Sequence, residues 1–227
     1  MKLALGLGCA LAVSAANLGE ARLARDRQDL SALEAAAASL AAEAAGRPKD
    51  AAAHYRAAVA ASYVAEVAWQ LGQKDKARQA VEAGIRLAQR AVELAGTVAE
   101  HHRILGTLCG QAVPFDLLRA FKYGGCARDA IQRALQLDPK SAAAYVSRGV
   151  GNYYLPAAMG GGAEVALEDF RKAAELDPGS DDAYLWMGIA LRSLKRFAEA
   201  RAAFEKSLAL NPARVWAKRQ LEKTPAR

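Results

Sequence analysis

The side chains that most often carry out catalysis are few and poorly placed in this sequence. Its three histidines are His54, His101 and His102, and the last two are adjacent. On a helix, adjacent residues point about 100° apart, which is a poor geometry for a shared metal ion. The sequence has no H-E-x-x-H pair, no paired C-x-x-C motifs, no G-x-S-x-G elbow and no phosphate-binding G-x-x-x-x-G-K-[ST] loop. We therefore predict that the protein is not an enzyme and has no catalytic residue, no metal site and no cofactor.

Two cysteines, Cys109 and Cys126, could form a covalent cross-link. In an oxidising compartment two thiols of one helical hairpin can pair as a disulfide. The alternative is that both remain free thiols and act as small buried apolar residues. The sequence leaves both interpretations open.

The N-terminus has the pattern of a secretory signal peptide. Lys2 precedes an uncharged stretch, and the apolar part of that stretch, Leu3–Val13, is too short to span a bilayer. Small residues follow at Ser14, Ala15 and Ala16, as a cleavage site requires. We predict that residues 1–16 are removed and that the mature chain is periplasmic or secreted, without a transmembrane segment. The alternative is a cytoplasmic protein in which this stretch is a first helix.

The composition indicates which elements must position these side chains. Alanine accounts for 56 of the 227 residues, whereas aromatic residues make up 7%. Alanine is the best helix former and a poor strand former, so an all-β or sheet-centred fold is excluded. The 53% apolar content is ample for a buried core. The sequence therefore predicts an all-α fold of closely packed helices.

Four prolines mark an internal repeat. An alanine lies twelve residues before each proline, and a larger apolar residue lies four residues after each alanine. The prolines are Pro48, Pro139, Pro178 and Pro212; the alanines are Ala36, Ala127, Ala166 and Ala200; the larger residues are Leu40, Ile131, Phe170 and Phe204. Repetition at a fixed spacing is typical of stacked helical repeats.

The last interval shows the repeat most clearly. It reads Tyr184-x2-Met187-Gly188-x2-Leu191, then Ala200-x3-Phe204 and Pro212. This pattern resembles the tetratricopeptide repeat, a helix-turn-helix unit of 34 residues. The resemblance implies a right-handed α-α superhelix of about nine or ten antiparallel helices, forming one domain over residues 17–227.

Within this repeat each marked residue type has a mechanical role. Gly106, Gly149 and Gly188, with the repeat alanines, should let the paired helices touch, and the large residues should fill the gap to the next repeat. Proline should end each second helix, and Ser141 and Ser180 should cap the helices that follow.

The clearest repeats are residues 99–140, 142–180 and 181–214, followed by a capping helix at 214–223. Compared with the last repeat, five extra residues separate Gly149 from Ala166, and nine separate Gly106 from Ala127. We interpret both insertions as loops on one face, the second ending at Gly124-Gly125.

The loop after Tyr153-Tyr154 and the ending Asn211-Pro212-x3-Trp216-x4-Leu221 look like those of bacterial secreted repeat proteins. Those proteins are similar to the T component of TRAP transporters and, distantly, to regulators of microtubule dynamics. The resemblance implies a scaffold of the cell envelope that binds a peptide or protein in its concave groove. The alternative is an adaptor or carrier for a small hydrophobic or acidic solute, associated with a transporter.

The resemblance also implies which residues line the groove, because the first helix of each tetratricopeptide unit faces it. Carried onto this chain, the partner-binding residues are Tyr153, Tyr154, Arg103, Arg192, Glu100, Asp182 and Trp69, and the same positions include Leu185 and Ile189. Tyrosines beside arginines suit a peptide or a small carboxylate ligand. The alternative for the two tyrosines is that they pack under the inserted loop.

Charge is concentrated at the C-terminal end. Residues 192–227 contain ten Lys or Arg and three Glu, and this balance of +7 equals the net charge of the whole chain. The cations carry no nucleic-acid-binding motif, so we expect no nucleic-acid partner. A solvated cap and an anion-binding surface are the two interpretations.

Overall fold

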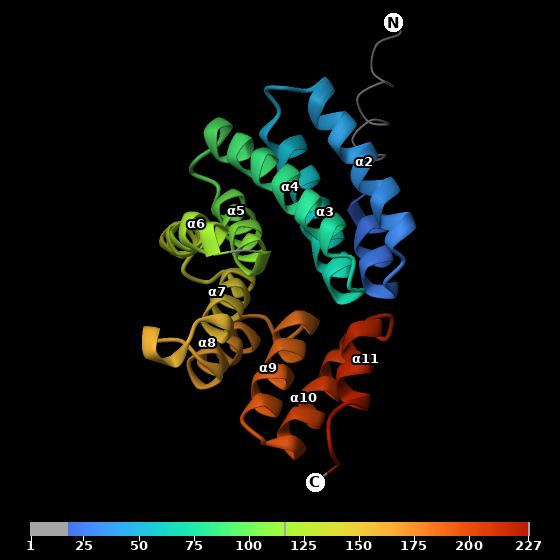
Figure 1. Cartoon of the computed structure of the whole chain (residues 1–227), viewed down its shortest axis with the longest axis vertical. Helices are drawn as coiled ribbons and strands as arrows, with labels where there is room; N and C mark the ends of the chain where they lie inside the picture. Colours follow the sequence, from blue (N-terminus) through green and yellow to red (C-terminus); the bar gives the residue numbers. More distant parts are fainter. Residues whose placement is uncertain (1–17, 116, 227) are drawn as a thin grey trace, which may run out of the picture. The chain divides into compact units, whose positions relative to one another are not determined.

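All regular structure in the described residues is helical, as predicted (Figure 1). The computed structural model describes residues 18–115 and 117–226, and these ranges hold eleven α-helices, one more than the upper end of the prediction. They are a helix over residues 18–27, α2 (Leu30–Gly46), α3 (Ala51–Gln70), α4 (Lys74–Leu94), α5 (Ala99–Ala112), α6 (Leu117–Leu137), α7 (Ala142–Tyr154), α8 (Ala163–Leu176), α9 (Asp181–Ser193), α10 (Phe197–Leu210) and α11 (Val215–Glu222). The predicted signal peptide, residues 1–16, lies outside the described residues.

The predicted stop and start signals act as expected. The helices α2, α6, α8 and α10 each end two residues before one of the repeat prolines. The hydroxyl groups of Ser141 and Ser180 accept hydrogen bonds from the N–H groups three residues later, at 3.2 Å and 3.3 Å. These caps satisfy N–H groups that have no partner inside the helix.

The chain forms two compact units with a boundary between Gly96 and Thr97. The contacts group the helices into two sets, and the single solenoid domain over residues 17–227 stays a prediction. The boundary falls in the turn between α4 and α5, because the helices on each side pack on members of their own unit.

In the first unit α3 is the central helix, packed between α2 and α4. Twelve of its 20 residues are buried, most of them alanine. A helix that is apolar around its circumference must be covered on several sides. The small side chains let the neighbouring backbones approach closely.

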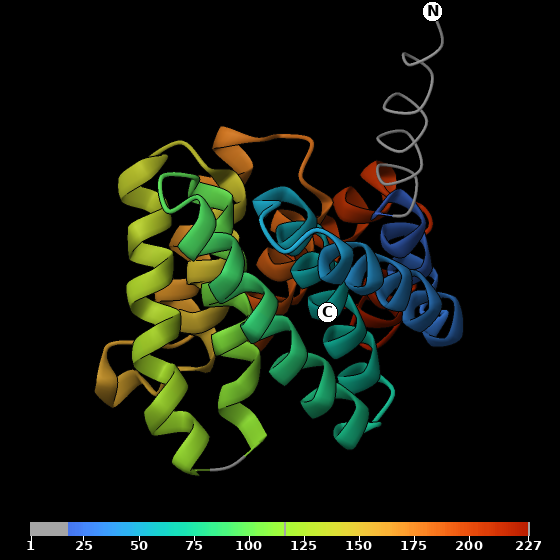
Figure 2. The ribbon, with the colours of Figure 1, turned by 90° about the horizontal axis from the view of Figure 1, so that it is seen from above.

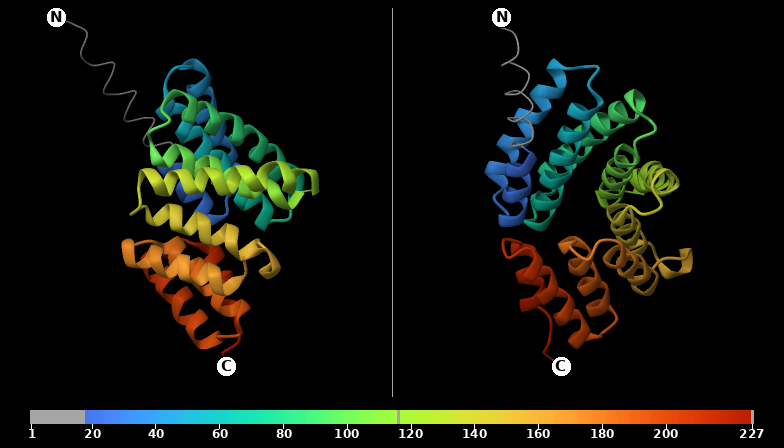
Figure 3. Two further views of the ribbon diagram at one scale, coloured as in Figure 1. Left: turned by 90° about the vertical axis from the view of Figure 1, so that its left-hand side faces the viewer. Right: turned by 180° about the vertical axis from the view of Figure 1, so that it is seen from behind.

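The second unit consists of three helix pairs and a terminal helix. Figure 3 shows this unit as the stacked pairs α5/α6, α7/α8 and α9/α10, with α11 after them. The first helices also contact each other, α5 with α7 and α7 with α9. The first helices therefore form one layer of this unit, which we call the first-helix layer.

The close contact within each pair differs from the predicted one. A Cβ atom at Gly149 would lie 2.5 Å from the Phe170 ring, and one at Gly188 would lie 2.6 Å from the Phe204 ring. The repeat glycine therefore faces the large residue of its own second helix. We predicted that the large residue fills the gap to the next repeat. In the structure it first packs over the glycine, because the missing side chain leaves room for a ring.

One of the two insertions is helical. Gly124 and Gly125, predicted to end a loop, lie inside α6, which runs beside α5 (Figure 2). The inserted residues thus lengthen a helix, and only the short 3₁₀ helix η1 (Val113–Phe115) precedes it. The insertion after α7 does form a loop, around the 3₁₀ helix η2 (Ala157–Met159).

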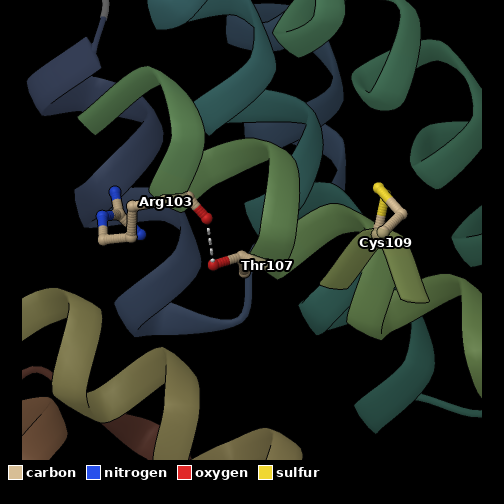
Figure 4. Close-up of a disulfide and its surroundings, with 4 residues drawn as sticks. Arg103, Thr107 and Cys109 are labelled. Atoms are coloured by element: carbon tan, nitrogen blue, oxygen red, sulfur yellow. Dashed lines mark hydrogen bonds between the residues drawn. A yellow bond between two sulfur atoms is a disulfide. The ribbon is translucent and has the colours of Figure 1, made fainter. Parts of the chain in front are cut away.

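A disulfide joins α5 to α6 across this hairpin (Figure 4). Cys109 and Cys126 are bonded with their Cα atoms 6.0 Å apart. Cys109 is fully buried. The cross-link holds the lengthened part of α6 on α5, next to the two glycines that would otherwise weaken the helix.

None of the described helices combines the length and the apolar character that crossing a bilayer would require.

Candidate partner-binding site

Four aromatic rings from three helices of the second unit form a continuous group, which we call the ring cluster: Tyr153, Tyr154, Trp186 and Trp216. Tyr153 and Tyr154 end α7, and their ring centroids lie 5.1 Å apart. Each lies close to Trp186 on α9, at 6.3 Å and 6.2 Å. Trp186 in turn contacts Trp216 on α11 at 5.3 Å. All four contacts are edge-to-face, the arrangement that ring quadrupoles favour.

The core supports the ring cluster from below. Phe170 is fully buried and stacks on Trp186 at 6.1 Å. Tyr153, Trp186 and Trp216 are partly buried and pack on the same core. Tyr154 is 68% exposed, so it does not pack under the inserted loop. The rings are thus anchored on one side and open on the other.

The loop after α7 is held by backbone hydrogen bonds. The Gly162 N–H donates to the Asn152 carbonyl at 2.8 Å, which closes the loop back onto α7. Gly160 and Gly162 have φ values of 84° and 110°, a conformation in which glycine avoids the strain of a Cβ atom. The loop therefore fixes the end of α7 that carries the two tyrosines.

A buried carboxylate fixes α7 on α8. Asp169 is 5% exposed and accepts hydrogen bonds from Arg148, at 2.6 Å and 3.0 Å, and from the Asn152 amide at 2.8 Å. The bond to Asp169 raises the pKa of Arg148 above its ordinary value. All donors come from α7, and one of them, Asn152, directly precedes the two tyrosines. This ion pair therefore orients the helix that presents them.

The polar groups of the ring cluster are two tyrosine hydroxyls and two indole N–H groups. Across the part of the chain that the structure describes, neither tyrosine hydroxyl and neither indole N–H of the cluster has a hydrogen-bond partner. An indole N–H can only donate, and a phenol can donate or accept. The site can therefore bind a ligand that offers apolar surface together with hydrogen-bond acceptors.

Two of the predicted residues on α9 are engaged with the C-terminal segment. Asp182 accepts a hydrogen bond from Arg214 at 3.2 Å, and Arg214 is 1% exposed. Arg192 donates to the Gln220 side chain at 2.6 Å and to its carbonyl at 3.2 Å. Arg192 therefore joins α9 to α11 and keeps part of its surface exposed.

Two further predicted residues lie on α5. Glu100 and Arg103 form an ion pair at 2.8 Å. One turn later, the hydroxyls of Thr107 and Ser147 lie 3.0 Å apart and join α5 to α7. In Figure 4 the Arg103 side chain projects away from the disulfide. The two predicted residues thus belong to the first-helix layer and are already paired.

The remaining predictions differ in outcome. Trp69 is 41% exposed and belongs to the first unit. The ammonium group of Lys74, in the same unit, lies 5.9 Å from the centre of the Trp69 ring. Leu185 and Ile189 are buried, at 0% and 6% exposure, so they form the core and cannot line a groove.

The sequence reasoning missed Trp186 and Trp216 as site residues. The repeat positions assign Trp186 no groove role, and Trp216 lies beyond the last repeat. The signal that could have found them is rarity, because the chain has only three tryptophans.

Comparisons with known proteins agree with this architecture. Residues 181–214 match the model of the family described as "Tetratricopeptide repeat", and these are the residues of the last predicted repeat. A thermophilic TPR protein of Thermus thermophilus (TTC0263) has a similar structure, with a TM-score of 0.62 at 19% identity, over 91% of this chain and 99% of that one. The chain thus contains a tetratricopeptide repeat, and its fold is that of tetratricopeptide repeat proteins.

Other similarities are weaker. YrrB, described as a TPR protein with an unusual peptide-binding site, gives a TM-score of 0.45 at 17% identity, over 91% of this chain and 90% of that one. An uncharacterised protein of Methanocaldococcus jannaschii (MJ0572) is 48% identical over 50 residues, which is 22% of this chain. The chain spans 58% of the length of that relative.

Proposed function

We propose that the protein is a non-enzymatic interaction scaffold that binds an extended peptide segment of a partner protein across the ring cluster. The observation that carries the proposal is the exposure of a preorganised aromatic surface whose four polar tips have no partner among the described residues. Rigid Tyr and Trp rings provide large contact areas at a low cost in side-chain entropy. A peptide backbone supplies the carbonyl acceptors that the indole N–H groups need.

The test is capture of a partner from cells. Cross-linking in intact cells, followed by affinity purification and mass spectrometry, should enrich a partner with the wild-type chain. The double variant Tyr153→Ala/Tyr154→Ala should lose it, because it removes the exposed Tyr154 ring and the partly buried Tyr153 ring and leaves Gly149, Phe170 and the disulfide in place.

Leu71→Ala is the matched control, because it removes an exposed large apolar side chain from the other unit. It should leave capture unchanged. Equal capture by the wild type and the tyrosine variant, with both folded by circular dichroism, would show that the ring cluster is not the binding site.

We further propose that the scaffold works in the bacterial cell envelope. The signal-peptide pattern of residues 1–16 supports export. The Cys109–Cys126 disulfide supports it as well, because disulfides form and persist in oxidising compartments. Cell fractionation and the intact mass of the mature protein test this. The expected species is periplasmic or secreted and lacks the leader, and a cytoplasmic chain of full mass would refute the proposal.

A further inference from the structure

The last helix, α11, carries cationic residues on the face that contributes Trp216 to the ring cluster. On a helix that turns about 100° per residue, Arg219, Gln220 and Lys223 lie within roughly 60° of Trp216. Lys218 lies about 160° away from it, on the opposite flank. Arg219 and Lys223 are exposed, and Gln220 is the residue that binds Arg192. The ring cluster ends at Trp216, and a cationic stripe made of Arg192, Arg219 and Lys223 therefore begins there.

The cations of this end fall into two groups. Arg196 pairs with Glu199 at 2.6 Å, Arg214 with Asp182 at 3.2 Å, and Arg201 donates to the Thr224 carbonyl at 3.1 Å. By contrast, no residue in the described part of the chain forms an ion pair with Arg219 or Lys223. Of the cations at this end that form no ion pair among the described residues, Arg219 and Lys223 are the two on the face of α11 that carries Trp216.

We propose that the partner segment is acidic: its apolar side chains lie on the ring cluster and its carboxylates bind Arg219 and Lys223, with Arg192 beside them. This inference rests on the proposed function and names the chemistry of the partner. It is supported by charge complementarity, because residues 192–227 carry a formal charge of +7 while the rest of the chain is neutral. Arginine and carboxylate groups form strong, charge-assisted hydrogen bonds.

The position of the stripe favours a peptide over a membrane surface. A membrane surface would attract exposed cations on both flanks of α11, including Lys218, and would not depend on the rings. A protein segment that runs along the ring cluster meets only the flank that carries Arg219 and Lys223. The two flanks of one helix therefore provide an internal test.

The experiment uses the full chain and a phage-displayed library of random peptides as the probe. Peptides selected by the wild type should contain apolar or aromatic residues next to an excess of Asp and Glu. Their affinity should fall about five- to tenfold in Arg219→Gln/Lys223→Gln, and the loss should shrink at high salt. The control Lys140→Gln/Lys218→Gln removes the same charge from exposed sites off the stripe and should bind like the wild type.

Each outcome has one meaning. Selected peptides without an acidic excess that still need Tyr153 and Tyr154 would overturn the acidic partner and leave the proposed function intact. Selection of no peptide, or of peptides whose affinity is unchanged in Tyr153→Ala/Tyr154→Ala, would overturn both the acidic partner and the proposed function. Equal losses in the two charge variants, together with binding to vesicles rich in anionic lipid, would assign the charge to a membrane surface and overturn the proposal.

Discussion

At Gly149 a single missing side chain decides how closely two helices approach. The added methyl group of Gly149→Ala would lie 2.5 Å from the Phe170 ring, and this ring is fully buried and cannot move aside. We expect the free energy of unfolding to fall by about 1–3 kcal/mol, as in other overpacked cores. Urea unfolding followed by far-UV circular dichroism measures this loss.

Gly151→Ala is the matched control, because it lies on the same helix and an added Cβ would have no atom within 4 Å. It should stabilise the protein by about 0.5–1 kcal/mol through helix propensity alone. Equal effects of the two substitutions would contradict the packing role of Gly149.

The buried carboxylate of Asp169 holds α7 on α8. Asp169→Ala removes an acceptor that binds Arg148 and Asn152, and hydrogen bonds to charged groups are worth about 1.5–3 kcal/mol. We expect a loss of about 2 kcal/mol in urea unfolding, by the same reasoning. The neighbouring Glu168 is exposed, so Glu168→Ala should change stability by less than about 0.5 kcal/mol. An Asp169→Ala protein as stable as the control would show that the ion pair contributes little.

The hairpin of α5 and α6 depends on its disulfide. The bond encloses a loop with a sequence separation of 17, and closing a loop of this size in the unfolded chain stabilises a protein by about 3 kcal/mol. Reduction should therefore lower the urea midpoint of the wild type, measured with and without a reductant. The variant Cys109→Ala/Cys126→Ala should start near the reduced value and should not respond to the reductant. A wild type that is indifferent to reduction would refute this role.

The elements themselves were largely predictable, because each depends on neighbours in the sequence. Proline stops, serine caps and the glycine and alanine of each pair act within one helix or between consecutive helices, so their spacing reveals them. Gly124 and Gly125 misled the prediction because their helix is held by packing on α5 and by the bond at Cys126.

The ring cluster was only half predictable. Tyr153 and Tyr154 stand side by side in the sequence, but Trp186 and Trp216 meet across 30 residues. Their contact depends on the angle between successive helix pairs, and the spacing of the repeat residues in the sequence does not determine this angle. The same holds for the pairing of Arg192 with Gln220.

The second of the two compact units contains every feature of the proposed site. Residues 97–227 contain the ring cluster, the stripe and the disulfide. We expect this fragment, expressed alone, to fold with a cooperative thermal transition, because neighbouring repeats supply its contacts. Circular dichroism of the fragment checks this, and binding of the peptides selected by the full chain checks its site. A fragment without a cooperative transition would show that the first unit is needed for folding.

The contact between Trp186 and Trp216 also gives the molecule an intrinsic optical signal. Two indoles 5.3 Å apart at an interplanar angle of 77° are close enough for their electronic transitions to couple. The chain has three tryptophans, and the third, Trp69, lies in the other unit. In a Trp69→Phe protein all indole absorption and emission would come from this pair. The protein would then report occupancy of the proposed binding surface through near-ultraviolet dichroism, without any attached dye.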